Sequence, residues 1–160
     1  MRSVVIYYSY SGNTKRVSQV LTGLLAAKGE VESVELVSLD EAESFLAQCK
    51  RAFLRRRAKI QPVNFDLSRY DLICVGTPVW AFGPAPAINT YLDKCFGLEA
   101  KEVILFTTYG SGVGKERCLN YMQDILAKKG VKTFKRFSVS QGKVGEHNFV
   151  LSQIKEVLPL

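Results

Sequence analysis

Residues 4–14 read Val-Val-Ile-Tyr-Tyr-Ser-Tyr-Ser-Gly-Asn-Thr, and this stretch decides the fold. Val4 to Tyr8 form an unbroken apolar run, as in a strand that is buried on both faces of a parallel sheet. From Asn13 onward the apolar residues recur at helical spacing, at Val17, Val20, Leu21 and Leu24. The sequence therefore predicts a strand, a short polar loop and a helix.

The loop between this strand and helix is suited to an anion. Backbone N–H groups at a helix N-terminus have no intrahelical partner, and phosphate is the anion that most often binds there. Gly12 lets the backbone approach closely, while Ser9, Ser11 and Thr14 offer hydroxyl groups. The loop has one glycine and therefore lacks the spacing of Walker A and of the dinucleotide fingerprint. Since the loop itself has no Lys or Arg before Lys15, neutral donors would have to hold the charge, and we expect a phosphate monoester on a neutral tail.

The rest of the chain continues the alternation of strand and helix, and its 160 residues suit a single domain. The further predicted strands cover 31–37, 71–76, 102–108 and 131–139. The further predicted helices cover 41–60, 87–96, 115–129 and 148–158. In the helix over 41–60, we expect Phe45, Leu46, Cys49, Ala52 and Phe53 to face inward. Strand and helix alternate five times, which predicts an α/β fold with a parallel sheet.

The polarity of the strands predicts their order. The first, third and fourth strands are the most apolar, so they belong in the middle of the sheet, and the second and fifth belong at its edges. This predicts a doubly wound five-stranded sheet in the order 2-1-3-4-5, with helices on both faces. The loops after the first, third and fourth strands then meet at one end of the sheet.

The composition limits the function classes. The formal net charge is +7, and the basic excess lies mainly in 41–69 and 128–143, where it would attract acidic protein, nucleic acid or anionic lipid. Met1 leads directly into the first strand and no apolar run is long enough to span a bilayer, so we expect a cytoplasmic protein without membrane association. The four cysteines lie far apart and His147 is the single histidine, so we expect no metal site.

The two other loops at this end of the sheet supply aromatic and small residues. Thr77 to Gly83 contains Trp80, and Thr107 to Gly114 contains Tyr109 among glycines. Both rings could stack on a flat heterocycle, and exposed backbone amides could pair with its edge. We find no necessary acid, base or nucleophile in the three loops, so we expect no catalytic residue.

At this point the chain resembles the flavodoxin family. Ser9-Tyr-Ser-Gly-Asn-Thr14 is similar to that family's phosphate signature, and Gly76-Thr-Pro-Val-Trp80 to its loop after the third strand. The stretch from Trp80 to Asn89 resembles small single-domain flavodoxin-like proteins. The resemblance implies flavin mononucleotide (FMN) as cofactor. It implies that FMN is held by Ser9, Tyr10, Ser11, Gly12, Asn13, Thr14, Thr77, Pro78, Val79, Trp80, Ala81, Thr108, Tyr109, Gly110, Ser111 and Gly112.

The chain departs from this family in its charge. Flavodoxins that serve as low-potential carriers are typically acidic, whereas this chain is basic and has no Asp or Glu in 77–83 or 107–114. We therefore expect a second electron potential less negative than in acidic relatives, because negative charge near the ring disfavours the reduced anion.

Three functions remain open from the sequence. The first is an FMN-binding redox protein that carries electrons, as a monomer or homodimer, to a redox partner protein. The basic face would favour an acidic partner. The second is an NAD(P)H-dependent reductase of FMN and a quinone-type acceptor. The third is a binding module without redox function that docks acidic protein or nucleic acid through its basic face. Since the basic residues lack interleaved aromatics, we do not expect nucleic acid as a partner.

Overall fold

Five parallel strands form one sheet in the order β2-β1-β3-β4-β5 in the computed structural model, which describes residues 1–41 and 44–158. This confirms the predicted fold class and strand order. The strands are β1 (Arg2–Tyr7), β2 (Glu30–Glu35), β3 (Leu72–Pro78), β4 (Glu102–Tyr109) and β5 (Thr133–Ser140).

The burial of the strands explains their order. Every residue of β3 and β4 except the terminal ones is buried, and so is β1 after Arg2. β2 and β5 lie at the edges and are partly exposed. On the edge strand β5, Lys135 pairs with Glu102 of β4 at 2.8 Å. Apolar strands occupy the centre because only there are both faces covered.

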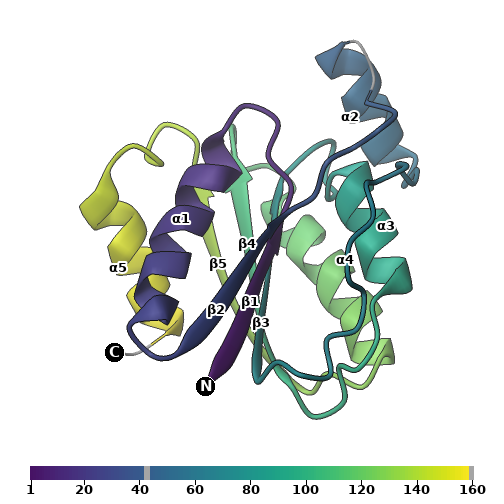
Figure 1. Cartoon of the computed structure of the whole chain (residues 1–160). Helices are drawn as coiled ribbons and strands as arrows, with labels where there is room; N and C mark the ends of the chain where they lie inside the picture. Colours follow the sequence, from purple (N-terminus) through teal and green to yellow (C-terminus); the bar gives the residue numbers. More distant parts are fainter. Residues whose placement is uncertain (42–43, 159–160) are drawn as a thin grey trace.

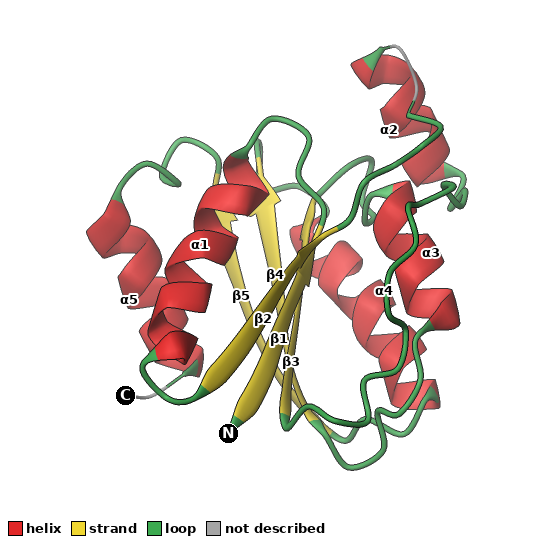
Figure 2. Ribbon diagram, viewed as in Figure 1, coloured by secondary structure: helices red, strands yellow, loops and turns green. Residues whose placement is uncertain are grey.

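Helices cover both faces of the sheet (Figures 1 and 2). α1 (Asn13–Ala26) and α5 (His147–Val157) lie on one face, and α3 (Pro86–Lys94) and α4 (Lys115–Lys128) lie on the other. The two cores are separated by the sheet, with Val5, Leu21, Ile104 and Ile154 in one and Ile6, Ile88, Leu105 and Met122 in the other. Within residues 1–41 and 44–158, no helix has both the length and the apolar character needed to cross a membrane.

The second helix differs most from its prediction. α2 spans only Phe45–Phe53, with Ser44 as its N-cap, whereas the sequence predicted a helix over 41–60, of which residues 42–43 lie outside the described residues. The prediction of the inward-facing residues was also wrong for three of them, because Phe45, Leu46 and Phe53 are exposed. Ala52 is buried and Cys49 is partly buried, as predicted, and Gln48 is buried instead of a larger apolar residue.

A left-handed residue ends α2 early. Arg55 has φ 52°, and the N–H groups of Arg55 and Arg56 donate to the carbonyls of Ala52 and Arg51. This is the Schellman arrangement, in which the left-handed position is normally a glycine. Here the Arg55 guanidinium lies 4.4 Å from the centroid of the Tyr121 ring, and its Nη2 lies 3.5 Å from the Phe82 carbonyl oxygen. These contacts stabilise Arg55 in the left-handed conformation. Because the position is not a glycine, nothing in the sequence indicated that the helix ends here.

An irregular segment over 58–70 covers the sheet after α2, and only its first residues, 58–60, were predicted to be helical. Within 58–70, Ala58, Leu67 and Tyr70 are buried in the core on the α3 and α4 side. The Thr90 hydroxyl of α3 fixes the start of this segment, accepting from the Ala58 N–H at 2.9 Å and donating to the Ala58 carbonyl at 2.7 Å. Because this segment fills the space beside β1, α2 is displaced toward the end of the sheet and stands off from the body (Figure 1).

Candidate functional site

A pocket of about 750 Å³ opens at the carboxyl ends of β1, β3 and β4. Parallel sheets of this strand order bind their ligands at this end, between the first and third strands. The pocket brings together most of the residues that the sequence predicted for the site. It is lined by Tyr10, Ser11, Asn13, Thr14, Pro78, Val79, Trp80, Ala81, Thr108, Tyr109, Gly110, Ser111 and Gly112 from the predicted set, and also by Phe45, Cys49, Phe82, Val113 and Gln141.

The loop after β1 leads into α1 through a left-handed glycine. Gly12 is the N-cap of α1 with φ 88°, and it has no side chain that could cap the helix. The first amides of a helix cannot bond within it, so the N–H groups of Asn13 and Thr14 are suited to an anion. The Lys15 N–H donates instead to the Ser9 hydroxyl at 3.2 Å. Ser9 and Gly12 therefore shape this loop without lining the pocket.

Thr14, in the first turn of α1, joins this loop to the carboxyl end of β4, where the next loop begins. Its side chain is buried, and its Oγ1 lies 2.8 Å from Oγ1 of Thr108, which is also buried. Each hydroxyl can accept one hydrogen bond and donate another, so one proton of the pair remains free to point at a ligand. The two loops are thus held at a fixed distance.

The loop after β3 makes a tight two-residue turn. Trp80 and Gly83 exchange N–H to carbonyl bonds at 2.9 and 3.0 Å, with φ 46° at Ala81 and φ 68° at Phe82. This is the type I′ turn, which strongly favours Asn and Gly at its centre. Each of these two residues costs roughly 1–2 kcal/mol in a left-handed conformation. The strain lies at the edge of the pocket, where such strain is commonly found.

Contacts on both sides hold this turn. The Thr77 hydroxyl donates to the Pro78 carbonyl at 2.9 Å and accepts from the Ala85 N–H at 3.0 Å. The Phe82 ring lies against Gly114, where a Cβ would come within 2.2 Å of it. Thr77 is fully buried and does not line the pocket, so its place in the structure is that of a support for the turn.

Trp80 lies at the centre of an aromatic cluster. Tyr8, Tyr10 and Phe45 meet it edge to face, at centroid distances of 5.5, 5.5 and 5.8 Å. Trp80 is only 4% exposed, whereas Tyr10 and Phe45 are 44% and 52% exposed. The larger open ring surfaces of this wall therefore belong to Tyr10 and Phe45. Beneath them, burial and the nearby Glu41 carboxylate raise the pKa of Tyr8, so its hydroxyl stays protonated and donates to Glu41.

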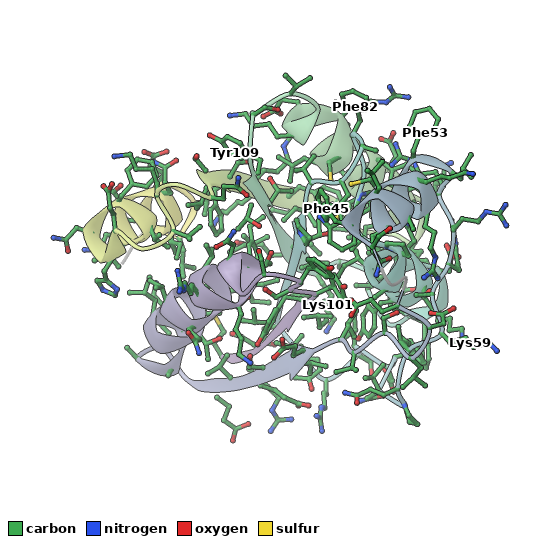
Figure 3. The ribbon with its side chains drawn as sticks, turned by 90° about the horizontal axis from the view of Figure 1, so that it is seen from above. Phe45, Phe53, Lys59, Phe82, Lys101 and Tyr109 are labelled. Atoms are coloured by element: carbon green, nitrogen blue, oxygen red, sulfur yellow. The ribbon has the colours of Figure 1, made fainter. Side chains whose placement is uncertain are left out.

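The loop after β4 forms the opposite wall. Gly112 and Gly114 have φ 82° and 85°, and Gly114 is the N-cap of α4. The Tyr109 ring lies beside Gly112 and carries the Lys115 ammonium 4.7 Å from its centroid. Glycines here leave the backbone amides open to a ligand. In Figure 3, which looks down on this end of the molecule, Tyr109, Phe45 and Phe82 lie in one area, where all three line the pocket.

The additional lining residues have two origins. Gln141 directly follows β5, so the rule that located the other loops at the carboxyl ends of strands could have found it. Phe45 and Cys49 come from α2, whose apolar spacing indicated packing against the sheet and gave no signal of a pocket. Phe82 and Val113 lie within the two predicted loops, next to residues that the resemblance implied.

The pocket is electrically neutral among the described residues. None of the side chains that line it is Asp, Glu, His, Lys or Arg. Burial raises the pKa of the Cys49 thiol, so this thiol is protonated at neutral pH. In the part of the chain that the structure describes, no cluster of His, Cys, Asp and Glu could hold a metal ion. The site can therefore bind a phosphate through neutral donors and a flat ring against aromatic side chains, and its described lining holds no carboxylate, imidazole or amine.

These features fit FMN. An open helix N-terminus with Ser11, Asn13 and Thr14 suits the phosphate, and the aromatic lining that includes Tyr10 and Tyr109 suits the ring system. The volume lies in the range of small-molecule sites, roughly 300–1,000 Å³. Contact of each predicted residue with FMN stays a prediction.

Comparisons with known proteins agree with this geometry. The family model described as Flavodoxin matches residues 2–150. A flavoprotein from Lactobacillus acidophilus, solved in complex with FMN, is 22% identical with a TM-score of 0.63, over 92% of this chain and 98% of that chain. Flavodoxin 1 from Bacillus cereus is 17% identical with a TM-score of 0.59, over 97% and 98%. An NADH:FMN oxidoreductase in its apo form is 18% identical with a TM-score of 0.67, over 99% and 87%. No curated protein matches the chain significantly by sequence.

Proposed function

The chain belongs to the flavodoxin family, and from this premise we propose that it is an electron carrier whose FMN occupies the pocket at the carboxyl ends of β1, β3 and β4. Family membership confirms the resemblance and the predicted cofactor. When bound, FMN supplies the redox chemistry, and the protein supplies binding and electrostatic tuning.

The neutral pocket is the observation that supports a carrier. An enzyme that acts on its own substrate normally places an acid, base or nucleophile beside the reacting atoms. Here none of the described lining side chains is a carboxylate, an imidazole or an amine, and burial keeps Cys49 protonated. The chain's contribution is therefore to bind the phosphate at Asn13 and Thr14 and to hold the ring against Tyr10 and Tyr109.

Reduction by nicotinamide nucleotides tests this proposal. The FMN-loaded protein is mixed with NADH or NADPH without oxygen, and flavin absorbance is followed over time. A carrier is bleached slowly or not at all by either nucleotide, but rapidly by dithionite. Bleaching within seconds by NADH or NADPH alone would contradict the carrier proposal.

A reductase is the second candidate, and the width of the pocket favours it. The pocket extends past the three loops to Phe45, Cys49 and Gln141, which leaves room for a flat second molecule beside the ring. The structural similarity to an NADH:FMN oxidoreductase agrees with this candidate. Rapid bleaching followed by reoxidation with a soluble quinone would establish it.

We also propose an acidic redox partner. Lys115 lies over Tyr109, and the Arg117 guanidinium lies 5.8 Å from the centroid of the Phe82 ring, so positive charge surrounds the pocket on this side. Opposite charges accelerate association at low salt, so electron exchange with an acidic partner slows as salt is added. Exchange rates that ignore salt would contradict this part of the proposal.

The thiols support a reducing compartment. Cys49, Cys74, Cys95 and Cys118 are all free, and the last three are fully buried. Proteins of oxidising compartments commonly join their cysteines as disulfides. We therefore propose that the protein works in the cytoplasm.

A further inference from the structure

Large apolar side chains are exposed along the outer side of α2 and at its C-cap, around the exposed Lys50. Leu46 is 82% exposed, Phe53 59% and Leu54 48%, whereas Gln48 and Ala52 face the body of the protein. Single exposed apolar residues are common, but several large ones on one short helix mark an interaction surface. We call Leu46, Phe53 and Leu54 the outer face of α2.

Unpaired basic residues accompany this face. The sequence from 44 to 65 contains six Lys and Arg residues and no Asp or Glu. Arg51 and Arg57 pair with Asp40 and Asp93, and Arg55 lies over Tyr121. The other three, Lys50, Arg56 and Lys59, are exposed and have no ion pair within residues 1–41 and 44–158.

The position of α2 leaves this face accessible. In Figure 1, α2 stands off from the sheet beyond its carboxyl end, next to the loops that form the pocket. Viewed from above that end, Phe53 and Lys59 lie at different places on the periphery of the molecule, while Phe45 lies further in, where it lines the pocket (Figure 3). One helix therefore presents Phe45 to the pocket and the outer face to the surroundings.

We propose that α2 docks the protein on an anionic lipid bilayer, with Leu46 and Phe53 inserted at the interface and Lys50, Arg56 and Lys59 against the lipid headgroups. Helices that lie in a membrane interface combine Phe and Leu on one face with Lys and Arg beside it. The inner leaflet facing the cytoplasm is negatively charged and attracts such basic residues. This inference revises the expectation of no membrane association, which considered only spanning segments.

A bilayer suits this surface better than an acidic protein does. The outer face projects from the molecule, so a protein would need a matching apolar pocket to bury Leu46, whereas a bilayer receives a projecting helix without one. The complete absence of acids from 44 to 65 also favours a uniform field of anionic headgroups over a patterned protein surface. The proposal does not depend on the redox role of FMN.

Vesicle sedimentation of the FMN-loaded full chain tests the proposal. One set of vesicles contains phosphatidylcholine alone, and the other contains phosphatidylcholine and phosphatidylglycerol in roughly equal amounts. We expect binding to the mixed vesicles at low salt and little binding to phosphatidylcholine alone. In a second measurement, Leu46→Trp reports insertion as a blue shift of emission on the mixed vesicles, since Trp80 is already buried.

Two groups of variants separate the apolar and the electrostatic contributions. Leu46→Gln with Phe53→Gln weakens partitioning at least about tenfold, since two buried apolar side chains are lost. Lys50→Gln, Arg56→Gln and Lys59→Gln together weaken it roughly ten- to a hundredfold at low salt. Thermal unfolding verifies the fold of each variant, and little change is expected because these side chains are exposed.

Matched controls lie at the opposite end of the sheet. Phe96 is 58% exposed, so Phe96→Gln removes an apolar side chain of similar exposure away from α2. Lys128→Gln, Lys132→Gln and Lys155→Gln together remove the same amount of charge near the carboxyl ends of α4 and α5. Both controls should bind the mixed vesicles nearly as the unmodified protein does.

Four results would overturn the proposal. The first is no binding to the mixed vesicles at low salt, and the second is binding that Leu46→Gln with Phe53→Gln leaves unchanged. The third is equal loss in the control variants, which would mean adsorption by net charge. The fourth is α2-dependent binding of polyglutamate without binding of vesicles, which would indicate an acidic protein as the occupant.

Discussion

Thr14 of α1 and Thr108 of β4 share a hydrogen bond between their hydroxyl oxygens at 2.8 Å, although they lie 94 positions apart. Both side chains are buried beside the pocket. The bond joins the loop expected to hold the FMN phosphate to the loop expected to border the ring.

Thr14→Val removes this bond and leaves the Thr108 hydroxyl without its partner. We expect a loss of about 1–2 kcal/mol in the free energy of unfolding of the apoprotein. We also expect FMN to bind at least about tenfold more weakly, since a donor to the phosphate is lost. Urea unfolding and fluorescence titration measure the two effects.

The control for this variant lies on the same helix. The Thr22 hydroxyl is buried and has no hydrogen-bond partner among the described residues. Thr22→Val should therefore maintain or raise stability and leave FMN affinity unchanged. If Thr14→Val and Thr22→Val changed stability and FMN affinity equally, the bond between Thr14 and Thr108 would contribute to neither.

Gly12→Ala tests the left-handed N-cap of α1. A Cβ at Gly12 would meet nothing within 4 Å, so its cost comes from φ 88° alone, at about 1–2 kcal/mol. Relaxation of the backbone would move the amides of Asn13 and Thr14, so FMN affinity should fall with stability. Isothermal titration with FMN and with riboflavin shows whether the loss belongs to the phosphate.

Gly23→Ala provides the comparison for Gly12. Gly23 lies within α1 and its Cβ would also meet open space, so alanine should stabilise the helix by about 0.5–1 kcal/mol. A loss of FMN affinity in Gly23→Ala, or equal riboflavin and FMN losses in Gly12→Ala, would count against a phosphate site at this helix end.

Ala81→Gly tests the strained turn after β3. Ala81 has φ 46° in a turn that favours glycine, so the substitution should raise the free energy of unfolding by up to about 1 kcal/mol. Ala127→Gly, in the regular helix α4, should lower it. If Ala81→Gly were as destabilising as Ala127→Gly, the turn would not be strained at this position.

Val113→Glu tests the neutrality of the pocket. Val113 lines the pocket and is exposed, so the glutamate would be ionised near the ring. A negative charge there should lower the potential of the second electron by about 40 mV, equivalent to about 1 kcal/mol. Redox titration measures the shift, and Val113→Gln, which adds no charge, should leave the potential unchanged.

The unmodified protein should accordingly have a second electron potential less negative than its acidic relatives. A very low potential in the unmodified protein, or equal shifts in Val113→Glu and Val113→Gln, would show that charge near the ring is not what sets it.

The sheet and the three loops were predictable because their signals are local and agree with one another. The apolar content of Val4 to Tyr8, of 71–76 and of 102–108 indicated the central strands. Since parallel strands end at the same side, the loops that follow them had to meet. Outside α2, each helix and strand lies within two residues of its predicted bounds.

The second helix was not predictable in the same way. Its apolar spacing indicated burial of Phe45, Leu46 and Phe53, but the irregular segment from Ala58 to Tyr70 already fills that side of the sheet. The stop after Leu54 depends on Arg55, whose left-handed conformation is held by Tyr121 and Phe82, far away in the sequence. Phe45 and Cys49 were therefore missing from the predicted site.

The irregular segment that covers β1 has a consequence for how the protein can change. Since Ala58, Leu67 and Tyr70 provide the core contacts, the residues on the outside of α2 carry little of the folding energy. Substitutions of these exposed residues can change which surface the protein binds without changing how it binds its cofactor. The surface proposed for docking, on the outside of α2, is thus separate from the core that supports the pocket.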